Sequence, residues 1–160
     1  MSVDAYLKID DIKGESQDNV HKDEIEVLSW GWGMSQPGSA HSGTGAGTGK
    51  VAVKNLTIQK CFDKATPNLM KYCCSGKHFG IARLTVRKAG EKPLEFIQIE
   101  LKDGLIVDVS VVGNPGDSQV RESVTLNFAS FKVEYVPQTA TGAGGAAIPM
   151  QWNVVKNAES

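Results

Sequence analysis

Residues 25–32, which read IEVLSWGW, contain a strand pattern whose phase changes in the middle. Ile25 and Val27 share one face of a strand, whereas Leu28 and Trp30 continue the alternation on the opposite face. Because successive side chains of a strand point to opposite faces, a one-residue change of phase requires a bulge or a strand that is buried on both faces. Bulges make the corners of closed sheets, so this stretch favours a β-barrel.

The alternation of apolar and polar residues recurs along most of the chain, which predicts about eight or nine short strands and an all-β barrel or sandwich. A second change of phase falls at Ala129-Ser130. The Asp103-Gly104 pair is typical of a tight hairpin, so two separate strands are expected before and after it. The apolar alternations are found in residues 3–9, 51–58, 82–87, 94–101, 105–112, 124–135 and 148–154.

One segment departs from this pattern and predicts a short α-helix at about 67–75, beside the barrel. Thr66 is a suitable N-cap, and Pro67 stands at the helical position that tolerates proline best. Gly76 can adopt the left-handed conformation that ends many helices. The side chains expected on the inner face of this helix are Leu69, Met70 and Cys73.

Length and composition indicate one globular domain over residues 1–160. The chain has 41% hydrophobic and 22% charged residues, and its formal net charge is -1. This balance does not favour nucleic acid as a partner. No apolar run approaches the ~20 residues of a membrane-spanning helix, so no membrane insertion is expected. The N-terminus lacks a basic start and an apolar stretch, which predicts synthesis in the cytoplasm without a cleaved signal peptide.

The residues that could carry chemistry are not arranged for it. His21, His41 and His78 lie far from one another and from cysteines, which is not metal-ligand spacing. No nucleophile motif of the G-x-S-x-G type occurs. We therefore expect no enzyme activity, no cofactor and no metal. The cysteines are odd in number and are expected to be reduced and buried in the core. They are Cys61, Cys73 and Cys74.

The segment of residues 34–50 is rich in glycine and predicts a long loop after the second strand. A compact domain with a loop of this length commonly uses it to contact another molecule. The loop partly matches a phosphate-binding loop, but Thr44 replaces its first glycine and Val51 replaces its metal-binding hydroxyl residue. A strand is also expected after Lys50, where that motif requires a helix. A monomeric ligand-binding barrel, with this loop as a lid, remains an alternative.

Several segments, in order along nearly the whole chain, resemble the haemolysin-coregulated proteins (Hcp) of the bacterial type VI secretion system. They are Tyr6-Leu7-Lys8-Ile9, Lys13-Gly14-Glu15-Ser16, residues 25–33, Gly38-Ser39 with His41, Gly49-Lys50-Val51, residues 63–70, Ser75-Gly76-Lys77-His78, residues 84–90, residues 124–129, Tyr135 with Pro137-Gln138, and Trp152-Asn153 with Asn157.

The resemblance implies a barrel of two antiparallel sheets with one flanking helix. It also implies hexameric rings that stack into a tube, which a contractile sheath expels with a spike protein at its tip. The subunit is then itself secreted into the extracellular space or a target cell, and small effector proteins can travel in the lumen.

By the same resemblance, the loop at 34–50 is the contact between rings. The residues expected to form this contact are Ser39, His41, Gly43, Thr44, Gly45 and Gly47. Asp103, Gly104 and Asp108 depart from the apolar or serine residues frequent in relatives, so cargo preference is expected to differ if they face the lumen.

Overall fold

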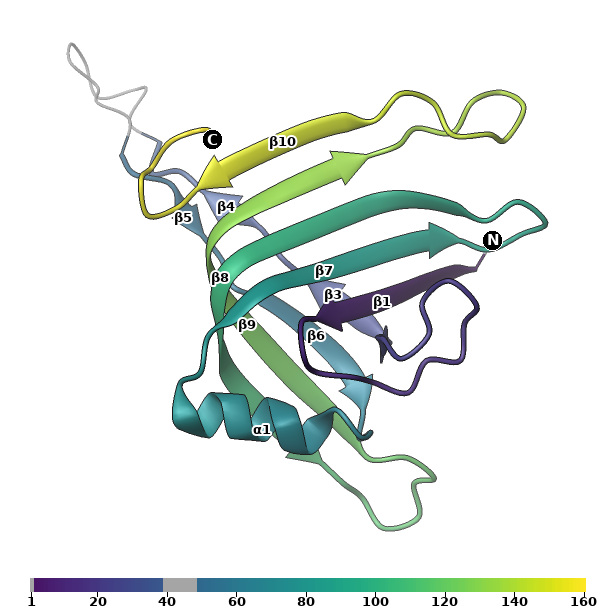
Figure 1. Ribbon diagram of the computed structural model, residues 1–160, viewed down its shortest axis with the longest axis vertical. Helices are drawn as coiled ribbons and strands as arrows, with labels where there is room; N and C mark the ends of the chain where they lie inside the picture. The colour runs from purple at the N-terminus through teal and green to yellow at the C-terminus, as the bar shows by residue number, and fades with distance from the viewer. Residues whose placement is uncertain (1, 39–48) are drawn as a thin grey trace.

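The computed structural model describes residues 2–38 and 49–160, which form mainly antiparallel β-structure and one helix (Figure 1). Eight strands make one sheet in the order β2-β1-β7-β8-β9-β6-β3, with β10 paired to β9, and β4 and β5 make a second, two-stranded sheet. The elements are β1 (Val3–Ile9), β2 (Ile25–Val27), β3 (Ser29–Gly31), β4 (Met34–Ser35), β5 (Ala52–Val53), β6 (Leu56–Cys61), α1 (Thr66–Ser75), β7 (Phe79–Lys88), β8 (Leu94–Val112), β9 (Arg121–Tyr135) and β10 (Ile148–Asn153).

The stretch with the change of phase joins the two ends of the large sheet. β2 pairs with β1, and β3, which follows after one residue, pairs with β6 at the other end of the strand order. The intervening Leu28 donates its main-chain N–H to the carbonyl of Gln59 at 2.8 Å. Ile25 and Val27 are buried and Leu28 is exposed, so the chain changes face where it changes partner. This confirms the predicted corner and curls the sheet into a nearly closed barrel.

The predicted hairpin at Asp103-Gly104 is wrong, because β8 runs through this pair as one bent strand. Gly104 pairs with Phe79 of β7 on one side and with Phe128 of β9 on the other. A Cβ atom at Gly104 would overlap the ring of Phe79 and the carbonyl of Asn127. The glycine is therefore needed for close packing inside the sheet, and Asp103, with φ of 53°, bends the strand without reversing it.

β9 confirms the second change of phase. It is a single strand in which Phe128 and Phe131 are both buried, three residues apart. Its first half pairs with β6 and its second half with β10, while β8 pairs along its whole length. The change of face therefore falls where the strand exchanges one neighbour for another, at a second corner of the barrel.

The helix is present, but its start and inner face differ from the prediction. Thr66 is the first helical residue and Ala65 occupies the N-cap position without a side-chain cap. The Thr66 hydroxyl instead accepts the N–H of Asp63 at 3.1 Å. Gly76 ends the helix with φ of 68°, as expected. Leu69 is buried and Cys73 is half-buried, as expected for the inner face of the helix. Met70 is exposed, so the prediction that it lies on the inner face is wrong.

The interior of the barrel is filled by buried apolar side chains, and it also contains one charged network. Lys60 and Glu122 are fully buried and form an ion pair. The Lys60 ammonium also donates to Asp63 at 2.7 Å and to Thr66 at 3.1 Å. This network attaches the beginning of α1 to β6 and β9. The apolar core includes Leu7, Ile9, Ile25, Leu56, Ile58, Leu69, Phe79, Leu84, Ile99, Leu101, Leu126 and Phe131.

The cysteines only partly follow their prediction. All three are free thiols, as expected. Cys61 and Cys73 are half-buried, but Cys74 is exposed, since it follows Cys73 on the helix and lies on its outer side. Over residues 2–38 and 49–160, α1 is too short to cross a bilayer and no other helix does so.

Candidate functional site

The residues predicted to form the contact between rings lie outside the described part of the chain. They are Ser39, His41, Gly43, Thr44, Gly45 and Gly47. The flanking strands are defined: Met34 of β4 pairs with Val53 of β5, so both ends of the glycine-rich segment are held together. A strand follows Lys50, as expected, which is the wrong context for a phosphate-binding loop.

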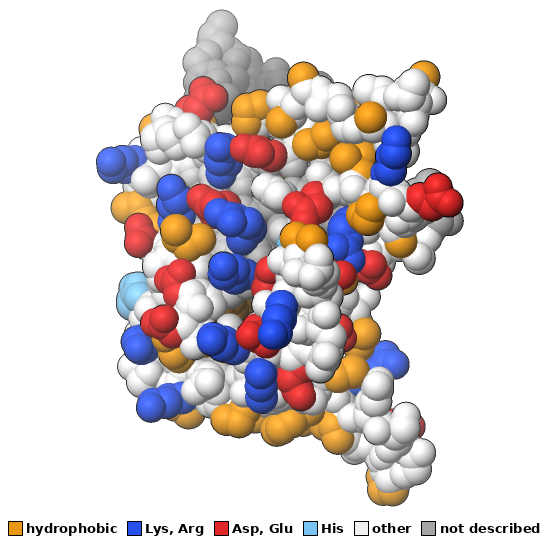
Figure 2. Space-filling model, turned by 45° about the vertical axis from the view of Figure 1, so that its right-hand side comes forward, with side chains coloured by type: hydrophobic (Ala, Val, Ile, Leu, Met, Phe, Trp, Pro, Cys, Tyr) orange, Lys and Arg blue, Asp and Glu red, His pale blue; other side chains and the backbone are white. Residues whose placement is uncertain are grey.

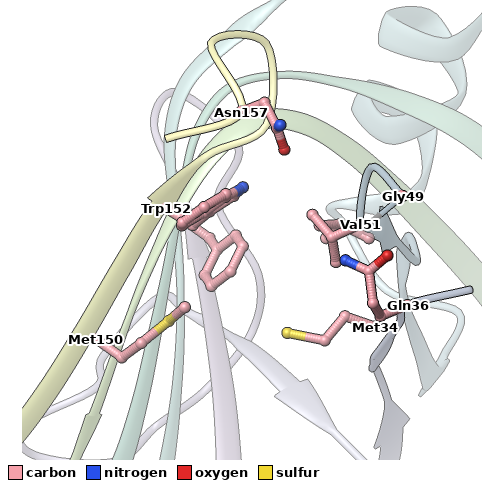
Figure 3. A pocket seen from close by; sticks show the side chains of 9 residues that line it. Met34, Gln36, Gly49, Val51, Met150, Trp152 and Asn157 are labelled. Atoms are coloured by element: carbon pink, nitrogen blue, oxygen red, sulfur yellow. The ribbon is translucent and has the colours of Figure 1, made fainter. Parts of the chain in front are cut away.

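A pocket of about 280 Å³ lies beside these two strands. Figure 3 shows Met150 and Trp152 of β10 on one side of the gap, facing Met34 and Val51 on the other. The indole N–H of Trp152 is buried and has no hydrogen-bond partner among the described residues. The pocket is mainly apolar, with two amide side chains in its lining, and it lies between β10 and the β4–β5 sheet. The remaining lining residues are Gln36, Gly49, Val53, Phe131 and Asn157.

Besides the short strands β2 and β3 at the two ends of the strand order, two longer sections of the large sheet have an edge to which no other strand in the described part of the chain is paired. β10 pairs only with β9, and the section of β8 after Gly104 also pairs only with β9. Unpaired edges invite association with another chain. Exposed apolar side chains lie along both sections, namely Val107, Val111 and Val112 on β8 and Ile148 and Met150 on β10.

The outer face of β3, β6, β9 and the end of β8 consists of small polar side chains. The hydroxyls of Thr57 and Thr125 are 3.2 Å apart, and Gln59 donates to Ser123 at 3.2 Å. Asp108, which accepts a hydrogen bond from Ser110, is exposed at the end of one row. We call this surface the polar face. It contains two rows of residues that are paired across the strands. The first row is Ser29, Gln59, Ser123 and Ser110, and the second row is Gly31, Thr57, Thr125 and Asp108.

The outer face of β1, β7, β8 and β9 is charged instead. Arg83 donates to Glu100 at 2.7 Å, which lowers the pKa of that carboxyl group. Lys132 pairs with Glu134 at 2.9 Å, which raises the pKa of the lysine. Figure 2 shows a face of the molecule on which acidic and basic side chains are mixed. Such a mixed surface favours neither a polyanion nor a polycation as partner.

A second charged cluster fixes the segment between β1 and β2. Arg87 donates to both carboxylate oxygens of Asp18, at 2.7 and 3.0 Å, which holds the pKa of Asp18 well below its usual range. His21 stacks on Tyr6 with ring centroids 4.6 Å apart and contacts Glu95 at 2.6 Å. Sequence reasoning missed this cluster, because its members come from segments far apart in the chain.

The described residues hold no group of three or more His, Cys, Asp or Glu side chains placed to bind a metal ion. The features that stand out are instead strand edges, apolar hollows and two chemically distinct outer faces. The described part of the chain is therefore a β-barrel whose exposed strand edges favour contact with other protein chains.

Comparison with known proteins identifies the family. The sequence profile of the family described as "Type VI secretion system effector, Hcp" matches residues 6–135. Protein hcp1 of Pseudomonas aeruginosa is 50% identical, with 100% of both chains covered. The crystal structure of Hcp1 from Salmonella typhimurium matches with a TM-score of 0.84 and 43% identity over 100% of both chains. A further structure, described as a type six secretion system protein, matches with a TM-score of 0.93 and 28% identity over 99% of this chain and 100% of the other. The chain belongs to the Hcp family of type VI secretion proteins.

Proposed function

We propose that this chain is the non-enzymatic tube subunit of a type VI secretion system, folded as a single Hcp-like domain over residues 1–160. It closes into hexameric rings, and the rings stack into a tube that is tipped by a spike protein and expelled by a contractile sheath. The subunit is secreted with the tube. Its residues 34–50 form the contact between rings.

The open edges of β10 and of the end of β8 carry the proposal of ring closure. They lie on different strands, β8 and β10, and each has exposed apolar side chains beside unpaired main-chain groups. Contact between two different surfaces of identical chains is head-to-tail, and it produces a ring when the rotation closes. Ring closure would cover edges that otherwise promote aggregation.

The polar face supports a second element, the lining of the lumen. Its small side chains form hydrogen bonds with one another, as the hydroxyls of Thr57 and Thr125 do at 3.2 Å. They therefore leave few free hydrogen-bonding groups to which a passing protein could bind tightly. We assign this face to the lumen, where effector proteins are carried. Of the three residues expected to change cargo preference, Asp108 lies on this face, whereas Gly104 is buried inside the sheet.

A charge placed on an open edge tests ring closure. Ile148, on β10, is 61% exposed, so Ile148→Lys leaves the core intact but places an ammonium group in the contact between subunits. We expect rings in the wild type and monomers in the variant by light scattering, with unchanged circular dichroism. The control is Val155→Lys, since Val155 is 73% exposed and lies after β10. Normal rings in Ile148→Lys would refute the edge contact, and a wild type that is monomeric at all concentrations would favour the ligand-binding barrel.

A further inference from the structure

A hollow of about 250 Å³ lies at one end of the polar face, beside the connection between β8 and β9. Figure 1 shows this connection extending past α1 at the end of the barrel. We call it the Arg121 hollow, because a single arginine is the cation of its lining. Polar side chains dominate that lining, among them Gln59, Ser110, Asp117, Gln119, Arg121 and Ser123.

The register of β9 places Arg121 on the polar face. Because side chains alternate along a strand, Arg121 points to the same side as Ser123 and Thr125. It is paired with Cys61 of β6 on one side and with Val112 of β8 on the other. The face therefore ends, beside the β8–β9 connection, in a guanidinium group rather than in another small polar side chain.

The charge of this arginine is not used inside the described part of the chain. The other two arginines are bound to carboxylates, since Arg83 donates to Glu100 and Arg87 donates to Asp18, both at 2.7 Å. Arg121 is exposed and forms an ion pair with no other described residue. Its N–H groups are therefore available to another molecule.

Two neighbours add hydrogen-bond donors to the hollow. The Ser123 hydroxyl accepts a hydrogen bond from Gln59 at 3.2 Å, which leaves its own proton to donate. The carbonyl oxygen of Gln119 accepts the Cys61 thiol at 3.3 Å, and its NH₂ group has no acceptor among the described residues. A carboxylate only accepts hydrogen bonds, and its two oxygens match the fork of a guanidinium group. The donor set thus suits a carboxylate.

The carboxylates of the chain that border the hollow limit the strength of such a contact without preventing it. Asp117 is exposed and accepts a hydrogen bond from the amide of Asn114 at 3.2 Å. Glu122 follows Arg121 in the strand, but its carboxylate is buried inside the barrel with Lys60. Solvent screens the exposed Asp117, so a carboxylate bound to Arg121 is held weakly and reversibly.

We propose that the Arg121 hollow binds aspartate and glutamate side chains of the transported protein, so that this chain favours cargo with an acidic surface patch. The inference rests on the proposed lumen, in which ring closure places one Arg121 from each subunit around the passage. Asp108, which forms no ion pair with another described residue, pairs with Thr125, four residues along β9 from Arg121. It therefore lies about 13 Å along the strand and repels the acidic patch that Arg121 attracts.

A fluorescein-labelled hexaglutamate peptide, titrated with assembled rings, tests the proposal by fluorescence anisotropy. Arg121→Gln should weaken its binding about fivefold, the upper range for one exposed ion pair, and Asp117→Asn should strengthen it. Arg121→Glu should bind labelled hexalysine in preference to hexaglutamate, a reversal that damage to the fold would not produce. The matched control is Lys92→Gln, which removes the same charge from an exposed position outside the hollow and should bind like the wild type. Light scattering checks that each variant forms rings.

The possible results separate the site from the proposed function. Equal binding of hexaglutamate to wild-type and Arg121→Gln rings would overturn the proposal. Displacement of the peptide by inorganic phosphate, but not by chloride at the same ionic strength, would assign the hollow to a free anion and would also overturn it. Loss of rings in Arg121→Gln would make this residue a subunit contact instead. A wild type that forms no rings would contradict the proposed function itself.

Discussion

Substitution of Lys60 should destabilise the protein far more than an ordinary lysine substitution. The Lys60 ammonium is fully buried and donates to Glu122, to Asp63 at 2.7 Å, to Thr66 at 3.1 Å and to the carbonyl of Cys61 at 2.9 Å. Lys60→Met removes all of these bonds at once. Glu122 then keeps a single donor, the Thr66 hydroxyl at 2.7 Å, for a carboxylate that is also fully buried.

The expected loss follows from the charge that is left behind. Breaking a buried ion pair by removing one partner typically costs about 3–5 kcal/mol, whereas replacing both partners by apolar groups is often neutral. One oxygen of Glu122 already lacks a hydrogen-bond partner among the described residues, so little can compensate the remaining charge. We therefore expect Lys60→Met to lower the free energy of unfolding by about 3–5 kcal/mol, and Lys60→Met/Glu122→Leu to recover at least about 2 kcal/mol of it.

Urea unfolding, followed by circular dichroism at one fixed protein concentration, measures these differences. The concentration must be fixed because association of subunits adds to apparent stability. The exposed Lys92 provides a control, and Lys92→Met should change stability by less than about 0.5 kcal/mol. A loss below about 1 kcal/mol for Lys60→Met, or a double variant no more stable than the single one, would refute the reasoning.

Three other perturbations have defined outcomes. Asp18→Asn should lower stability at neutral pH and make stability depend less on acid pH. Arg87 depresses the pKa of Asp18 in the folded state, so this carboxylate stabilises the wild type above about pH 4, the unfolded value, and the stabilisation is lost as the pH falls further. Unfolding measured over a range of acid pH compares the variant with the wild type. Gly104→Ala should cost about 1–3 kcal/mol by overpacking, whereas Gly31→Ala, with open space at its Cβ, should unfold like the wild type in urea. Deletion of residues 43–49 should leave rings but abolish tubes in electron micrographs, and normal tubes would refute the loop contact.

The architecture could be predicted because burial alternates with a period of two. The change of phase after Val27 marks the residue at which the chain leaves β1 and joins β6. Thr66, Pro67 and Gly76 placed the helix to within one residue. The hairpin failed because an Asp-Gly pair also suits a bent strand, and only the packing of Phe79 against Gly104 decides between the two.

The interaction surfaces were harder to foresee. The polar face requires the registers of four strands, which bring residues such as Ser29 and Ser110 into one row. Lys60 also gave no sign in the sequence that its side chain would be buried. These surfaces depend on tertiary pairing, which local alternation does not specify.

Assembly of the purified protein tests the central claim most directly. Electron micrographs of the wild-type chain should show hexameric rings with an open centre, and light scattering should give a mass that corresponds to the ring. A particle that remains monomeric at every concentration in both measurements would contradict the proposal that this chain acts as a tube subunit.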